Sequence, residues 1–138
     1  MHVTRAPMRP STHARLFLTA TAVWAAFWVA GLPHYYQQYR PGPLVAGSGV
    51  LIALVYWLGW RAIARMRPEV APGRSAWMAF YFTVPLAIYD ALYCGAYLGH
   101  GAGFVTRYWY LSIFYVLPWL FWLPMGVWRS RHAAVAPR

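Results

Sequence analysis

Residues 75 to 99 read SAWMAFYFTVPLAIYDALYCGAYLG, a predominantly apolar run that contains a single acid, Asp90. A helix of this length is long enough to cross a bilayer, since each residue adds ~1.5 Å and the hydrocarbon layer is ~30 Å thick. The run therefore predicts a transmembrane helix that carries a carboxyl group. The side chains expected on the same helical face, at offsets of three, four or seven residues from Asp90, are Thr83, Tyr93, Cys94 and Tyr97.

The whole chain has the composition of a membrane protein. It has 138 residues, enough for one domain, and 61% of them are apolar. The formal charge of +10 comes from twelve arginines, which flank the apolar runs. This pattern favours a role in membrane topology over nucleic-acid binding. The single cysteine, Cys94, excludes an internal disulfide and a cysteine-based zinc site.

Four apolar spans are predicted, at about residues 16–33, 44–60, 76–98 and 108–128, with flexible basic tails at 1–14 and 129–138. We interpret the first span as a retained helix, because its apolar run is longer than the core of a usual signal peptide. The two tails and the middle loop hold ten arginines, whereas the two other loops hold only Arg40 and Arg107. The positive-inside rule then places both termini in the cytoplasm. We expect one domain over 1–138: an all-α, up-down bundle of four transmembrane helices in a bacterial inner membrane.

Prolines and small residues suggest local features of these helices. Pro85 lies in the middle of the third span and predicts a kink there. Pro118 and Pro124 predict a bent fourth helix that is irregular toward its inner end. Small residues recur every four positions along the first and third spans, which predicts close packing between helices. These two stripes are Ala22, Ala26 and Ala30, and Ala91, Gly95 and Gly99.

Asp90 is the strongest candidate for a functional residue, since an acid at this depth is costly and is often functional. It is a candidate acid, proton carrier or cation ligand. The alternative is a structural carboxyl that bonds Tyr93, Tyr97 or a carbonyl freed by a proline. His34 and His100 are expected at the external boundary, where they are candidates for a proton path to Asp90. Two histidines without nearby acids do not predict a metal site, and we expect no cofactor.

Aromatic residues make up 20% of the chain and are unusually frequent in the fourth span. Residues 108–110 fit an external interfacial belt. The deeper rings either face lipid or line a cavity for a lipophilic ligand near Asp90. The candidate ligand-binding residues are Thr83, Tyr93, Tyr97, Trp119 and Trp122.

These observations lead to one main hypothesis and two alternatives. The main hypothesis is a small polytopic membrane protein that binds a ligand or acts as an accessory or assembly subunit. Its partners are the lipid bilayer, a lipophilic small molecule, and a second copy or another membrane subunit, but no nucleic acid. The first alternative is a membrane-embedded isomerase or cyclase of an isoprenoid-like substrate, with Asp90 as acid. The second is a small proton-coupled transporter that acts as a dimer.

Overall fold

The computed structural model describes residues 8–31 and 40–135. Within these ranges all regular secondary structure is helical and no strand occurs, which confirms the all-α class. The elements in chain order are α1 (Pro10–Gly31), α3 (Pro41–Ala64), α4 (Ala71–Tyr81), α5 (Val84–Asp90), the π-helix η1 (Ala91–Tyr97), η2 (Gly101–Gly103), α6 (Phe104–Arg107), α7 (Trp109–Ser112), η3 (Ile113–Tyr115) and α8 (Leu117–Val135).

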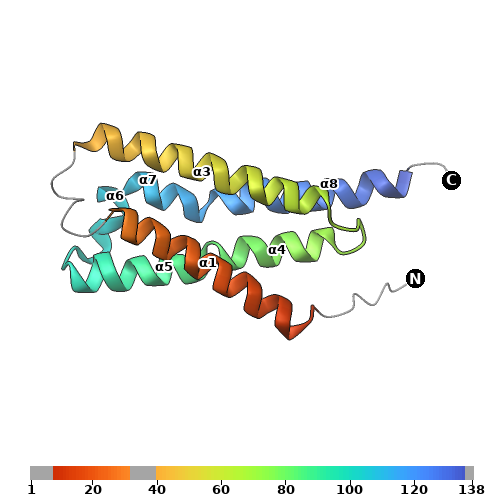
Figure 1. The fold of residues 1–138 in the computed structure, drawn as a ribbon, viewed down its shortest axis with the longest axis horizontal. Helices are drawn as coiled ribbons and strands as arrows, with labels where there is room; N and C mark the ends of the chain where they lie inside the picture. Colours follow the sequence, from red (N-terminus) through yellow and green to blue (C-terminus); the bar gives the residue numbers. More distant parts are fainter. Residues whose placement is uncertain (1–7, 32–39, 136–138) are drawn as a thin grey trace.

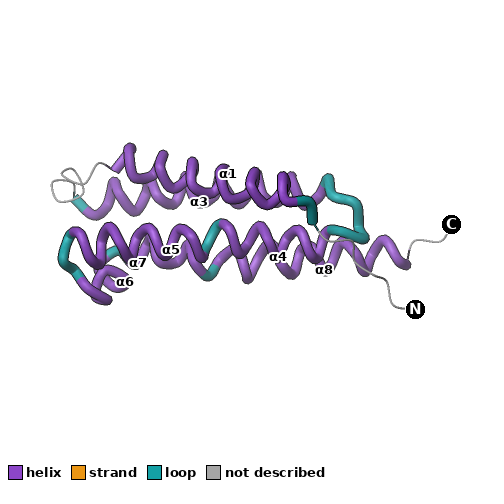
Figure 2. Tube along the Cα trace, turned by 90° about the horizontal axis from the view of Figure 1, so that it is seen from below, coloured by secondary structure: helices purple, strands orange, loops and turns teal. Residues whose placement is uncertain are grey.

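The helices run back and forth along one long axis (Figure 1). α1 leads away from the end where the chain starts, α3 returns, α4, α5 and η1 lead away again, and α7 and α8 return. α1 packs on α4 and α5, α3 packs on α7 and α8, and α4 packs along α8. Figure 2 shows the resulting two layers, α1 with α3 over α4 and α5 with α7 and α8. The start of α1 and the end of α8 therefore lie at the same end of the molecule.

Two segments are long and apolar enough to cross a membrane by length and composition, Val45–Ala64 and Ala71–Tyr97. They coincide with the second and third predicted spans. Only 11% of the apolar window in the first segment and 28% in the second is buried inside the protein. Most of this apolar surface faces outward, which indicates membrane association of these two helices.

The closest helix contacts involve glycines, but not those of the predicted stripes. A Cβ atom at Gly126 of α8 would lie 2.8 Å from the carbonyl oxygen of Ala71 in α4. A Cβ atom at Gly59 of α3 would overlap the Trp122 indole of α8. Side chains larger than hydrogen at these two positions would push the helices apart.

The predicted packing of the two small-residue stripes against each other does not occur in the described part of the chain. Ala22, Ala26 and Ala91 are exposed, and the side chain of Ala30 lies outside the described set. Gly95 instead approaches the Phe104 ring, in the hairpin that directly follows η1. The rotation of α1 turns its stripe outward, because the bulkier face of that helix covers α4 and α5.

The break predicted at Pro85 is confirmed. α4 ends at Tyr81, Phe82 and Thr83 form a turn, and α5 begins at Val84. The Thr83 hydroxyl donates a hydrogen bond to the carbonyl oxygen of Ala79 at 2.7 Å, replacing a backbone donor lost at the break. The Trp119 indole N–H in turn donates to the Thr83 hydroxyl at 3.0 Å. Side chains thus meet the Ala79 carbonyl oxygen at the break, which would otherwise face an apolar surrounding unpaired.

The irregular part of the last segment lies elsewhere than predicted. α8 runs unbroken from Leu117 to Val135 with Pro124 inside it, whereas the interruptions fall earlier, at Tyr108 and between Ile113 and Val116. Pro118 is the second residue of α8, a position where a missing N–H costs little. Its ring prevents the preceding turn from continuing as regular helix, so the break appears upstream.

The first and last helices are longer than predicted and include residues assigned to flexible tails. α1 begins at Pro10, and proline is well suited to a first helical position because its φ is already helical. α8 continues to Val135 because no proline or glycine follows Gly126 before Pro137. The Arg129 side chain also donates a hydrogen bond to the Met66 carbonyl oxygen at 2.7 Å, which ties the end of α8 to the middle loop.

Candidate functional site

Asp90 lies where α5 changes into the π-helix η1. The wider turn is visible in the backbone, since the N–H of Leu98 bonds the carbonyl oxygen of Tyr93, five residues earlier, at 2.9 Å. Short π-segments of this kind interrupt α-helices most often at functional sites. The change of helix type determines which side chains after Asp90 face the interior.

Two aromatic side chains from other segments donate hydrogen bonds to the Asp90 carboxyl group. The Trp24 indole N–H of α1 donates to Oδ1 at 2.8 Å, and the Tyr115 hydroxyl of η3 donates to Oδ2. Each carboxyl oxygen thus accepts one bond. The carboxyl group therefore connects three segments that are distant in sequence.

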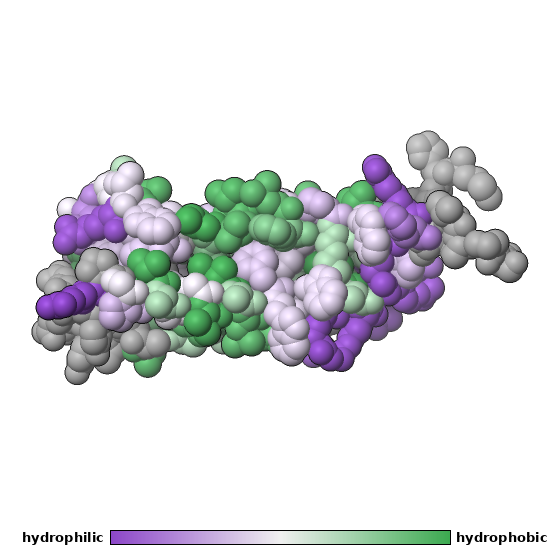
Figure 3. Space-filling view, turned by 90° about the horizontal axis from the view of Figure 1, so that it is seen from above, coloured by the Kyte–Doolittle hydropathy of each residue, from purple (hydrophilic) through white to green (hydrophobic). Residues whose placement is uncertain are grey.

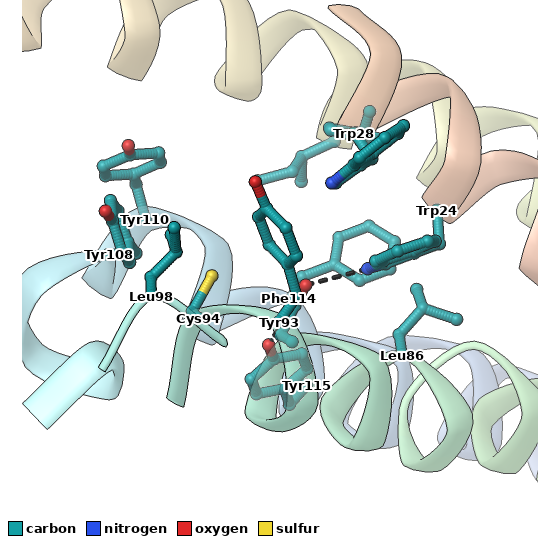
Figure 4. A pocket seen from close by; sticks show the side chains of 13 residues that line it. Trp24, Trp28, Leu86, Tyr93, Cys94, Leu98, Tyr108, Tyr110, Phe114 and Tyr115 are labelled. Carbon is teal, nitrogen blue, oxygen red and sulfur yellow. Dashed lines mark hydrogen bonds between the residues drawn. The ribbon is translucent and has the colours of Figure 1, made fainter. Parts of the chain in front are cut away.

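A partly open cavity of about 70 Å³ lies beside this carboxyl group, lined mainly by residues of α1, α3, α5, η1, α7 and η3 (Figure 4). At roughly 10–15 Å³ for one water centre, this volume holds several waters or the compact end of a lipophilic molecule. Most of the lining side chains are aromatic. The rings are those of Trp24, Phe27, Trp28, Tyr93, Tyr108, Tyr110, Phe114 and Tyr115.

Two further polar groups at this cavity face each other and have no other hydrogen-bond partner among the described residues. They are the indole N–H of Trp28 and the hydroxyl of Tyr93, both buried. Figure 4 shows Tyr93 rising from η1 toward Trp28 of α1, and the two rings meet edge to face at 5.9 Å. The Tyr93 hydroxyl proton has no acceptor among the described residues, and an unmet buried donor costs ~1–3 kcal/mol, so this hydroxyl favours a polar atom bound in the cavity.

The described lining of the cavity contains an acidic side chain but no basic one. Asp90 is the one carboxylic acid among the described lining residues, and these include no arginine or histidine. The ion pair formed in the described ranges, Arg67 with Glu69 at 3.4 Å, lies on the exposed middle loop. Within the part of the chain that the structure describes, no basic side chain of the cavity lining neutralises the Asp90 carboxylate.

The predicted site residues separate into three groups. Asp90 and Tyr93 line the cavity. Thr83 and Trp119 bond each other at the α4–α5 break, and Trp122 is buried in the core against Gly59. These last three residues are structural neighbours of the site and do not line it.

The remaining candidates lie at or beyond the edge of the cavity. Tyr97 is 78% exposed and stacks on Tyr93 with ring centroids 5.5 Å apart. His100 lies in the connection after η1, with its Nε2 atom 3.5 Å from the hydroxyl oxygen of the cavity residue Tyr108. His34 lies outside the described residues.

The cavity residues that α1 and η3 supply, chiefly Trp24, Trp28 and Tyr115, were not predicted from the sequence. Trp24 and Trp28 recur at a spacing of four and stack with centroids 6.3 Å apart, so they share one helical face. A tryptophan at the same depth in the membrane as a buried acid is a possible hydrogen-bond donor to that acid. The first span contains such a residue, Trp24. Tyr115 gave no such signal, because its neighbours in the fourth span are equally aromatic.

The described residues contain no group of three or more histidine, cysteine, aspartate or glutamate side chains able to hold a metal ion. The polar groups of the described cavity lining are instead one carboxyl, two indole N–H groups, a thiol and phenolic hydroxyls. The chain matches no model of a known protein family, no curated protein and no solved structure.

Proposed function

We propose that this chain is a four-span inner-membrane protein, with both termini in the cytoplasm, that binds a small lipophilic molecule in the cavity beside Asp90. The single observation that carries this proposal is a carboxyl group at the wall of an aromatic cavity inside an apolar bundle. Ligand sites of helical bundles are built in this way, from side chains of facing helices.

The outer surface supports four spans. Large apolar side chains on each of the long segments are more than 60% exposed, and Val50 reaches 70%. The others are Leu18, Leu92 and Leu120. Figure 3 shows apolar residues gathered over the middle of one face, with hydrophilic residues toward both ends. Apolar surface of this extent is stable against lipid tails and unfavourable in water.

The orientation rests on the arginines. α3 ends, α4 begins and α8 ends at one end of the molecule, which carries Arg61, Arg74 and Arg129. Arg107 lies at the opposite end, where α6 ends. The whole sequence divides ten to two in the same sense, so the arginine-rich end is the cytoplasmic one. The Asp90 cavity then lies in the outer half of the membrane.

The orientation is tested with single cysteines in a Cys94→Ala background. Gly73 and Gly103 lie at opposite ends, and a Cβ atom at either position meets nothing within 4 Å. An impermeant thiol reagent added to intact cells should label Gly103→Cys and spare Gly73→Cys. The opposite labelling pattern would invert the topology.

The bound molecule is tested by native mass spectrometry of the purified protein. Cys94 lines the cavity and is 9% exposed, so Cys94→Phe should fill the space that a ligand needs, whereas Cys94→Ala should leave it open. We expect a co-purifying lipophilic molecule with the wild type and with Cys94→Ala, and its loss with Cys94→Phe. Equal retention by Cys94→Phe would show that the molecule binds elsewhere.

A membrane-embedded isomerase or cyclase is the second candidate, because the carboxyl group and the aromatic faces share one cavity. Such an enzyme would use Asp90 to donate a proton and the rings to stabilise a carbocation. The two donated hydrogen bonds on Asp90 support binding over this chemistry, because both oxygens act as acceptors. Turnover of an isoprenoid olefin by wild type, but not by Asp90→Asn, would favour the enzyme.

A further inference from the structure

The cavity beside Asp90 has the chemistry of a site for an organic cation. We propose that its ligand is a lipophilic ammonium compound whose charged head lies between the Asp90 carboxylate and the faces of the surrounding rings. This inference rests on the proposed ligand-binding function and specifies the class of ligand.

The first step concerns the charge on Asp90. Its Oδ1 accepts from Trp24, whose indole nitrogen is a donor only, and its Oδ2 accepts from the Tyr115 hydroxyl. An ionised carboxylate accepts both bonds without rearrangement. Hydrogen bonds to a charged group are stronger than those between neutral groups, so this pair of donors stabilises the negative form.

The second step concerns the missing counter-charge. A carboxylate buried without a cation is costly in an apolar surrounding. None of the described residues that line the cavity is basic. A ligand that carries a positive charge would therefore gain an attraction that the protein itself leaves unused.

The third step concerns the walls. Trp24 and Trp28 lie nearly parallel, with an interplanar angle of 17°, and Tyr93 stands at 85° to Trp28. Phe114 lines the same space. Ring faces attract a cation within about 6 Å of the centroid, and a cage of several rings is the usual site for an ammonium head. A metal ion is less suited, because hard cations require several oxygen ligands and this cavity offers one carboxyl group.

The proposal is tested with two compounds of the same shape, benzyltrimethylammonium and its neutral carbon isostere, neopentylbenzene. Binding to purified protein in detergent is measured as a concentration-dependent rise in Tm. We expect wild type to bind the cation at least about tenfold more tightly than the isostere, the range of a desolvated cation–aromatic contact with an added carboxylate. Asp90→Asn should remove this preference and bind both compounds alike.

Two variants complete the design. Trp28→Leu removes one wall of the cage without touching either hydrogen bond of Asp90, and it should reduce the preference for the cation severalfold. Tyr97→Leu changes an exposed ring outside the cavity and should bind as wild type does. If Asp90→Asn does not fold, the cation preference of Trp28→Leu alone tests whether the cation binds between these rings.

The outcomes separate this inference from the function on which it rests. Equal or tighter binding of neopentylbenzene by wild type would refute the cation class and leave lipophilic binding in place. Retention of the preference in both Asp90→Asn and Trp28→Leu would place the cation at another site and also refute the proposal. A failure of both compounds to raise Tm would contradict the proposed binding function together with the inference.

Discussion

Gly126 lies at the closest contact between α8 and α4, and replacing it with alanine should destabilise the protein. A Cβ atom there would lie 2.8 Å from both the Ala71 carbonyl oxygen and the Ser75 Cβ atom, and closer still to the Ser75 hydroxyl oxygen. Ala71 and Ser75 are fully buried, and the Ser75 hydroxyl is held by the Pro72 carbonyl oxygen at 3.0 Å. The added methyl group must therefore move a backbone. Overpacking of this kind costs ~1–3 kcal/mol.

The matched control is Gly49→Ala in α3, where a Cβ atom meets nothing within 4 Å. Alanine is the better helix former, so this variant should gain up to ~1 kcal/mol. The free energies of unfolding are compared by titrating the purified proteins from mild detergent into a denaturing one and following helical circular dichroism. We expect the two variants to lie on opposite sides of wild type, ~1–4 kcal/mol apart when both estimates are combined. Equal stability would refute the close α4–α8 contact.

Three further predictions concern the polar contacts. Asp90→Leu leaves the Trp24 and Tyr115 donors without an acceptor and should lower the free energy of unfolding by ~1–3 kcal/mol for each. Asp90→Asn should lose less stability in the same titration, because its carbonyl oxygen still accepts a bond. Tyr93→Phe removes a buried hydroxyl whose own proton has no acceptor among the described residues and whose oxygen faces the Trp28 N–H. Tm without ligand should therefore stay near that of wild type, while the affinity for the co-purifying molecule falls. A clearly lower Tm would indicate a further partner for this hydroxyl. Thr83→Val should destabilise the protein by ~1–3 kcal/mol, since it leaves the Trp119 N–H and the Ala79 carbonyl oxygen without partners. Ligand binding by the folded variant should be unchanged. Weaker binding would show that the site extends to the helix break.

The sequence was sufficient to predict the helical class, the approximate helices and the break at Pro85. These features depend on local properties, namely apolar length, helix propensity and the missing N–H of proline. The position of the acid along the third segment could also be read directly. What could not be read is which face of α1 meets α5, because this depends on the rotation of two helices about their axes. The Trp24–Asp90 bond is a product of that rotation.

The grouping of the predicted site residues failed for a more specific reason. Thr83, Asp90 and Tyr97 are spaced by seven, and a regular α-helix would align them on one face. The structure departs from regular helix on both sides of Asp90, with a turn at Thr83 and the π-helix from Ala91 to Tyr97. Thr83 consequently bonds Trp119 of the last helix, whereas Asp90 faces the cavity.

The π-helix explains the directions in which the side chains after Asp90 point. A π-turn takes up about one residue more than an α-turn, so the side chains that follow it are rotated by roughly 100° relative to a regular helix. Tyr93 and Cys94, early in η1, still face the cavity, but Tyr97 at its end is turned outward. Leu98, which directly follows η1, also lies at the cavity wall. Leu98 thus adds an apolar side chain to a lining in which Asp90 is the one carboxylic acid among the described residues, an arrangement that suits the lipophilic cation proposed above.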